Sequence, residues 1–216
     1  NPDRSDLDAV ATALDAPDAT VLDALAPVVD VEQFITYWAA EILIAHWDGY
    51  SNNNNNFFVY HDPVSGQFKF MPWGVDGVMV PNNPQPTATQ PISVYAKAAL
   101  ARRLYLLPST QARYLDRLRS LLDTAWDETS ILAEIDRMEA LITPIADPTG
   151  TNGLAAQIDT VRTFVTTRRS DILTELAGGP PAWTQPLPDP PEFDFLGPVS
   201  GTFTTTYGTL GAANPF

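Results

Sequence analysis

The chain has 216 residues, and its 26 Asp and Glu outnumber its 12 Lys and Arg, so the formal net charge is −14. So negative a charge argues against nucleic acid or an anionic membrane as a main partner. The sequence has no cysteine, which excludes disulfides, thiol catalysis and cysteine metal sites. Its hydrophobic fraction of 44% is ordinary for a folded protein, and no apolar run approaches the roughly 20 residues that cross a bilayer.

The N-terminal residues 1–29 predict a helical segment at the periphery of the fold. Two weakly amphipathic stretches, residues 7–14 and 21–26, are rich in Asp and Ala. Pro17 and Pro27 break them, because proline cannot continue a helix.

The strongest helix signal follows, over residues 31–47. Asp30 is a good N-cap, and Gln33 at the third helical position completes a capping box. Apolar side chains such as Phe34 and Trp38 recur at helical spacing on several sides of this segment. So much apolar bulk predicts a buried helix.

This helix leads to Asp48, and a β-hairpin is predicted beyond it. Residues 56–61 are a run of β-formers, residues 62–66 read as a turn, and residues 67–71 alternate in the return direction. The hairpin then delivers the chain to a second isolated acid, Asp76.

The remainder is predicted to be helical and then extended. Residues 80–91 hold four prolines and read as an irregular loop. Further helices are predicted over residues 92–107, 109–126, 129–145 and 152–176. A Pro-rich linker over 178–198 and a Thr-rich strand over 199–207 follow. We therefore expect four parts, at residues 1–29, 30–177, 178–198 and 199–216, the last being the start of a β segment or of a further domain.

Two isolated carboxylates on either side of a short hairpin suit phosphoryl transfer from a magnesium nucleotide. That reaction needs carboxylates that hold the metal ion and one carboxylate near the attacking hydroxyl. Protein kinases place an asparagine five residues after the catalytic aspartate, and Asn53 follows Asp48 at this distance. Carboxylate and amide oxygens are ligands that Mg²⁺ prefers.

Three motifs are more specific than this chemistry. The chain carries His-Trp-Asp-Gly-Tyr at residues 46–50, Asn-Asn-Phe-Phe-Val-Tyr-His-Asp-Pro at residues 55–63, and Gly-x-Phe-x-Phe-x-Pro-Trp-Gly-x-Asp at residues 66–76. In these motifs it resembles the spore-coat-protein-H (CotH) kinase family of atypical protein kinases. The resemblance is strong over residues 30–79 and weaker as far as Leu176.

The resemblance implies a fold and an activity. The fold would be α+β and mostly helical, like the C-lobe of a protein kinase, with the hairpin carrying the site. The activity would be transfer of phosphate from ATP, with Mg²⁺ or Mn²⁺, to a protein hydroxyl. The family's usual setting implies an extracellular or cell-envelope location, with a protein substrate or surface proteins as partners.

The family's roles can be carried onto matching positions. Asp48 matches the catalytic-loop acid, and Asp76 matches the metal-binding acid of the Pro-Trp-x-x-Asp segment. Spacing from Asp48 favours Asn53 as the ligand of the metal and nucleotide, whereas alignment to the hairpin favours Asn55 or Asn56. Both Asn53 and Asn56 are therefore expected to hold the metal and the cofactor.

Two departures from the family pattern bear on activity. Many members read Pro-Trp-Asp-x-Asp, and here Gly74 replaces the first acid. The lysine and glycine-rich parts that hold the nucleotide phosphates would lie upstream of Asn1, and neither Lys69 nor Lys97 is placed like that lysine. The alternative is therefore a catalytically inactive kinase-like module of a cell-surface protein, and a weaker one is a Ca²⁺-binding adhesion domain.

Simpler interpretations apply to several of these residues. Asp-Gly is a common turn dipeptide, so Asp48 and Asp76 also suit plain turns. His46, at the end of an apolar helix, is expected to be a satisfied structural histidine. Core positions are expected for Trp38, Trp47 and Trp73. Surface charges paired with acids are expected for Arg102, Arg103, Arg113, Arg117, Arg119, Arg162, Arg168 and Arg169.

Overall fold

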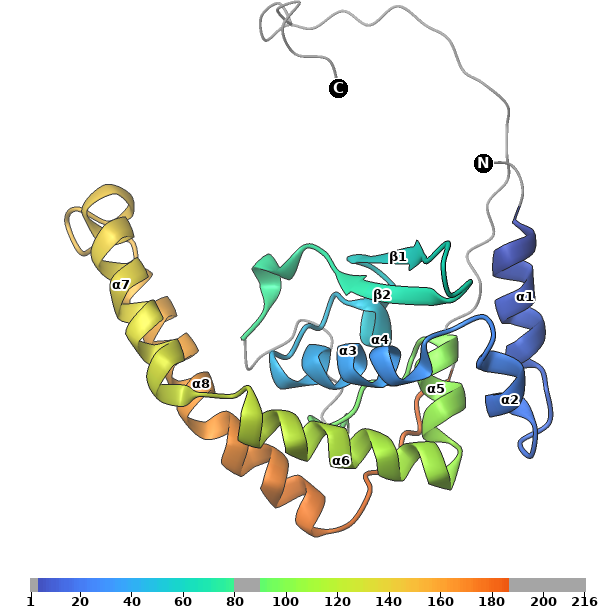
Figure 1. Ribbon diagram of the computed structural model, residues 1–216. Helices are drawn as coiled ribbons and strands as arrows, with labels where there is room; N and C mark the ends of the chain where they lie inside the picture. Colours follow the sequence, from blue (N-terminus) through green and yellow to red (C-terminus); the bar gives the residue numbers. More distant parts are fainter. Residues whose placement is uncertain (1–3, 80–89, 187–216) are drawn as a thin grey trace, which may run out of the picture.

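The computed structural model describes residues 4–79 and 90–186, and Figure 1 shows its elements arranged around one central helix. The elements are α1 (Ser5–Leu14), α2 (Val21–Leu25), α3 (Val31–Leu43), α4 (Tyr50–Asn53), β1 (Phe57–His61), β2 (Phe68–Pro72), the 3-10 turn η1 (Val75–Gly77), α5 (Ala99–Tyr105), α6 (Pro108–Thr124), α7 (Glu128–Ala146) and α8 (Leu154–Ala177). The described part is mostly helical with an antiparallel pair of strands, which confirms the α+β expectation. The predicted strand over 199–207 and nearly all of the predicted loop over 80–91 lie outside the described residues.

Helix α3 begins as its sequence predicts. The Asp30 carboxylate accepts the N–H of Gln33 at 3.1 Å, which confirms the N-cap. The Gln33 side chain does not complete the capping box. It donates to the backbone oxygen of Phe70 at 2.7 Å and accepts the Phe70 N–H at 2.9 Å. The start of α3 is thereby tied to β2.

The two faces of α3 pack on different layers. The Phe34 ring lies edge-on against Phe70 of β2, with centroids 4.8 Å apart. Trp38 stacks on Tyr114 of α6 at 3.9 Å. Figure 1 shows the result, with the hairpin on one side of α3 and α6 on the other. Burial of each such aromatic side chain stabilises the fold by about 1.5–3 kcal/mol. The packing of β2, α3 and α6 on one another is therefore a large part of what holds the fold together.

The predicted hairpin is confirmed, with β1 and β2 in antiparallel register from the Phe57–Pro72 pair to the His61–Phe68 pair. Phe68 and Phe70 turn one face of the sheet into the core. The other face leaves apolar side chains exposed, namely Phe58, Tyr60 and Met71.

The predicted helix over residues 31–47 is too long, because α3 ends at Leu43. Ala45 has a positive φ of 52°, which a right-handed helix cannot accommodate. The His46 N–H bonds to the Glu41 oxygen, five residues back, at 2.8 Å. The chain therefore turns sharply and carries Asp48 back toward the side of the helix.

The predicted helix over 92–107 is also wrong in its first half, since α5 covers only Ala99–Tyr105. Other elements take the backbone groups that a helix would need. The Glu175 carboxylate accepts the N–H groups of Ile92 at 3.0 Å and Ser93 at 2.7 Å. The indole N–H of Trp38 donates to the Tyr95 oxygen at 2.7 Å. Tertiary bonds thus override the local helical pattern.

The remaining predicted helices are confirmed within a few residues, as α6, α7 and α8. Figure 1 shows α7 and the first part of α8 side by side as an arm that projects from the body. After α8 the chain runs back over α5, where the Tyr105 hydroxyl donates to the Pro181 oxygen at 2.7 Å and Trp183 is buried. None of the helices described is both long and apolar enough to cross a membrane.

Candidate functional site

Three asparagine side chains converge on the carboxylate of Asp48. The amide nitrogen of Asn53 donates to one carboxylate oxygen at 2.6 Å, and that of Asn56 donates to the other at 2.6 Å. Asn55 also donates, at 3.4 Å to each oxygen. The sequence left these three asparagines as alternatives, and the structure brings all of them to the same acid.

The asparagine run folds into a compact turn. Its first part is α4, and Asn52 is buried there with its amide donating to the Trp47 oxygen at 2.9 Å. Asn54 and Asn56 have positive φ values of 53° and 45°. Asparagine adopts this left-handed conformation more readily than most residues. The run therefore has structural reasons for its composition, beyond low complexity.

Glu41 holds this turn from beneath, and the sequence analysis did not identify it. It is 2% exposed, and its carboxylate accepts the N–H of Tyr50 at 2.8 Å, the N–H of Ser51 at 3.0 Å and the hydroxyl of Tyr37. Burial raises its pKa, against the lowering effect of these hydrogen bonds. The signal in the sequence was weak, because Glu41 lies among apolar residues such as Trp38 and Ile42 with no motif around it.

His46 is wholly buried beside Glu41, with its Nδ1 atom 3.7 Å from Glu41 Oε1. Neither ring nitrogen has a hydrogen-bond partner among the described residues. The expectation of a satisfied structural histidine is therefore correct about burial and wrong about the partners.

Asp76 lies in η1, which follows the hairpin in the chain whereas Asp48 precedes it, and Asp76 is exposed. Two backbone hydrogen bonds and one close approach hold the segment around Asp76 next to the Asp48 turn and the end of α3. The Trp73 N–H donates to the Asn56 oxygen at 3.0 Å, and a Cβ built on Gly77 would lie 3.1 Å from Trp47 Nε1. The Met79 N–H donates to an oxygen at the end of α3 at 2.8 Å. The hairpin thus returns Asp76 to the neighbourhood of the Asp48 turn.

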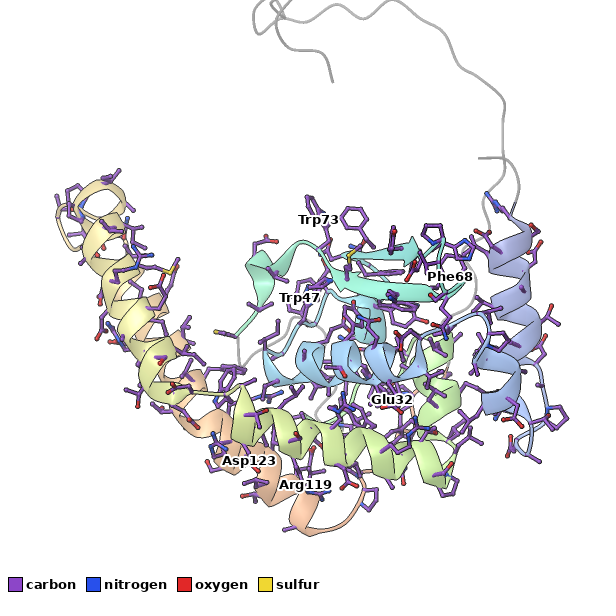
Figure 2. All side chains as sticks on the ribbon, viewed as in Figure 1. Glu32, Trp47, Phe68, Trp73, Arg119 and Asp123 are labelled. Atoms are coloured by element: carbon purple, nitrogen blue, oxygen red, sulfur yellow. The ribbon has the colours of Figure 1, made fainter. Side chains whose placement is uncertain are left out.

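The tryptophans near the site differ in burial. Figure 2 shows Trp73 projecting from the hairpin and Trp47 below it, toward the end of α3. Trp38 is fully buried, whereas Trp73 is 59% exposed. The expectation of a core position is confirmed for Trp38 and wrong for Trp73, whose ring lies against Phe58 on the outer face, with centroids 5.0 Å apart.

A cavity of about 350 Å³ lies between α3, β2 and η1. Its walls are mostly apolar, and they include Phe70, Pro72 and Val75. Glu41 and His46 line the same cavity and are its most polar members. Glu41, which holds the Asp48 turn, therefore borders a cavity that Val75 of the Asp76 segment also lines.

The oxygens of these side chains are of the chemical kind that Mg²⁺ or Mn²⁺ binds. An asparagine that turns its amide nitrogen to Asp48 turns its carbonyl oxygen away from that acid, where it can bind a cation. Together with the Asp48 and Asp76 carboxylates, these oxygens are hard ligands of the kind that Mg²⁺ takes. Within the part of the chain that the structure describes, no three His, Asp or Glu side chains cluster as a metal site.

Arg168 of α8 supports the chain just before the Asp48 turn. It was expected on the helix surface, and it is 5% exposed. Its guanidinium donates to the backbone oxygens of Ile42, Leu43 and Ile92, the last at 3.0 Å. Burial lowers its pKa. Arg168 thus fixes the end of α3, immediately before the Asp48 turn.

The two lysines are also placed. Lys69 forms an ion pair with Asp62 near the hairpin tip, at 2.9 Å. The backbone N–H of Lys97 donates to the Ser51 oxygen at 2.9 Å, so Lys97 lies behind the asparagine turn. Partial burial lowers the pKa of the Lys97 amine.

The chain matches a known protein family. The family model described as CotH kinase protein matches residues 1–172 of the 216. None of the curated proteins matches the chain. The family match includes the Asp48 turn, the hairpin and Asp76, together with the helices that support them. The chain belongs to the CotH kinase protein family.

Proposed function

We propose that this domain is an atypical protein kinase that transfers phosphate from ATP, with Mg²⁺ or Mn²⁺, to a protein hydroxyl. The observation that carries the proposal is the convergence of Asn53, Asn55 and Asn56 on Asp48, next to a hairpin that returns to Asp76. A carboxylate held by three neutral donors stays ordered without a neighbouring cation. Such an acid is suited to orient a reacting group.

In this proposal each residue has one role. Asp48 accepts a hydrogen bond from the acceptor hydroxyl and takes its proton as the phosphate is transferred. Asp76 holds the metal ion, with Asn53 and Asn56 supplying amide oxygens. The bound metal ion would neutralise charge on the nucleotide phosphates.

The family membership also supports an extracellular or cell-envelope location and a protein substrate or surface protein as partner. We propose this location and this kind of partner together with the activity. The inactive kinase-like module is the alternative, and it differs from the active enzyme in one measurable property.

That property is transfer of a labelled γ-phosphate from ATP in the presence of Mn²⁺ to the chain itself and to added protein. We expect Asp48→Asn to abolish the transfer. Asp62→Asn, which changes an acid at the hairpin tip, serves as the matched control and should leave the transfer unchanged. Absence of transfer by the unaltered protein would favour the inactive module. Equal transfer by the Asp48→Asn variant would contradict the role of Asp48.

A further inference from the structure

The position of Glu41 goes beyond what the family resemblance assigns. It is a buried acid in the last turn of α3, and it contacts the chain on both sides of Asp48. On the near side its Oε1 atom lies 3.7 Å from His46 Nδ1. On the far side its two oxygens accept the N–H groups of Tyr50 and Ser51, at 2.8 Å and 3.0 Å.

The backbone of Gly49 also lies close to the Glu41 carboxylate. A Cβ built on Gly49 would lie 2.3 Å from Glu41 Oε1 and 2.6 Å from His46 Nδ1, so no side chain fits at this position. Gly49 is directly bonded to Asp48, and its own N–H donates to the His46 oxygen at 3.2 Å. The peptide that follows Asp48 therefore rests directly on the Glu41 carboxylate.

The chemistry of the carboxylate suits this task. It receives three donors, which are two backbone N–H groups and the Tyr37 hydroxyl. Each oxygen accepts one of the two backbone donors, so a side chain with a single oxygen cannot replace it. Charge-assisted bonds of this kind are roughly twice as strong as those between neutral groups.

We propose that Glu41 is the positioning residue that fixes the orientation of Asp48 toward the reacting hydroxyl. This role rests on the proposed function, because Asp48 needs a fixed orientation only if it acts in phosphoryl transfer. Its structural basis, the clamp of one carboxylate on the Gly49–Ser51 backbone, can be tested without any activity.

The test compares Glu41→Gln with the unaltered protein by two readouts. Glutamine has nearly the same size, but its single oxygen can accept only one of the two N–H groups. The first readout is NMR of the Tyr50 and Ser51 backbone amides and of the Asn53 and Asn56 side-chain amides. We expect all of these signals to shift, and protection of one backbone amide from hydrogen exchange to fall about tenfold or more.

The second readout is the kinetics of phosphate transfer. Misplacement of a reacting group by about 1 Å costs on the order of 100-fold, so kcat of the Glu41→Gln variant should fall about 30- to 100-fold. KM for ATP should stay within about threefold, because Glu41 lies beneath the Asp48 turn and is only 2% exposed. A loss of bulk stability alone would instead lower the amount of active enzyme without a shift of the asparagine amide signals.

Two further variants keep the inference open to refutation. Tyr37→Phe removes the hydroxyl donor and leaves both backbone bonds, so it should retain kcat within about threefold and leave the asparagine signals in place. Gly49→Ala disturbs the same clamp from the other side and should shift the same signals as Glu41→Gln.

The outcomes separate the two proposals. If the unaltered protein transfers no phosphate, the proposed function fails, and the NMR comparison still decides whether Glu41 holds the Asp48 turn. If the asparagine amide signals are the same in the Glu41→Gln variant and the unaltered protein, the positioning role is overturned whatever the activity.

Discussion

Asn56 and Gly74 meet at the base of the hairpin, so closely that a Cβ built on Gly74 would lie 2.7 Å from Asn56 Cγ. Gly74 also has a positive φ of 56°, which L side chains rarely adopt. Asn56 in turn donates to Asp48 at 2.6 Å. The glycine that replaces an acid found in many family members is therefore part of the packing that holds the asparagine on Asp48.

We expect Gly74→Ala to disturb the site as well as the fold. The new Cβ must push the Asn56 side chain away, so the Asn56 amide signal should shift in an NMR spectrum and binding of ATP with Mn²⁺ should weaken. The unfavourable backbone conformation alone should cost about 1–2 kcal/mol of unfolding free energy in a urea titration.

Gly66→Ala is the matched control for that change. Gly66 has a similar positive φ of 72°, but a Cβ there would have no atom within 4 Å. It should lose a similar amount of stability and leave the Asn56 signal and ATP binding unchanged. Equal effects of the two substitutions on ATP binding would mean that the contact with Asn56 has no part in the site.

The fold was largely predictable where local signals agree with the tertiary contacts. Asp30 caps α3 as its residue type predicts, and the hairpin follows from its β-formers and its turn. The end of α3 was not predictable, because Glu41 and Arg168 decide it by bonds to residues distant in the sequence. The prediction of a helix over residues 92–98 was wrong for the same reason, since the Glu175 carboxylate accepts the N–H groups of Ile92 and Ser93.

The candidate site was predictable in its acids and asparagines, because spacing and motif order identify them. The contacts that bring these residues together were not predictable. The alternatives Asn53, Asn55 and Asn56 could not be separated by spacing, since a turn with two left-handed residues brings all three to Asp48. Glu41 was not identified because α3 also carries the exposed acid Glu32, and no sequence motif shows which of the two is buried.

Arg168 should be among the residues most important for stability. Replacing it with Met removes the Arg168 donor from the carbonyl oxygens of Ile42, Leu43 and Ile92, of which the Ile42 oxygen keeps the Ala45 N–H. We expect a loss of about 3 kcal/mol in unfolding free energy, measured by urea denaturation. Arg137→Met removes an exposed pair with Glu134 and should leave the unfolding free energy nearly unchanged. A loss below about 1 kcal/mol for Arg168→Met would contradict this account of the end of α3.

Asp62 should have a low pKa that depends on Lys69. Its side-chain bond with Lys69, helped by the Val64 N–H, lowers the pKa of Asp62 from 3.8 to about 2. The folded-state pKa is depressed, so this pair stabilises the fold above pH 3.8 and the contribution is lost as the pH falls toward 2. Lys69→Met should move the pKa of Asp62 back toward 3.8 in a carbon-detected NMR titration. An unchanged pKa would show that the hairpin tip alone sets it.

Glu41 should make the stability of the protein depend on pH in the opposite sense. Burial raises its folded-state pKa above the ordinary 4.5, so the folded protein retains a proton that the unfolded chain has released. Stability should therefore fall as the pH rises from 4.5 through the folded-state pKa.

Glu41→Gln has no such proton, so its stability relative to the unaltered protein should rise over that same pH window. Urea denaturation of both proteins at several pH values measures the difference directly. A difference that stays constant with pH would show that Glu41 remains charged in the folded state throughout.

The most direct test of the central claim is to locate a bound metal nucleotide on the isotope-labelled protein. Mn²⁺ broadens the NMR signals of nuclei close to it, so ATP with a trace of Mn²⁺ can be added while the amide signals are followed. We expect the strongest broadening at the side-chain amides of Asn53 and Asn56 and at the backbone amide of Asp76. Asp76→Asn should abolish the broadening, and Asp62→Asn should preserve it. Broadening that spares these three amides, or that is unchanged in the Asp76→Asn variant, would contradict a metal–nucleotide site between Asp48 and Asp76.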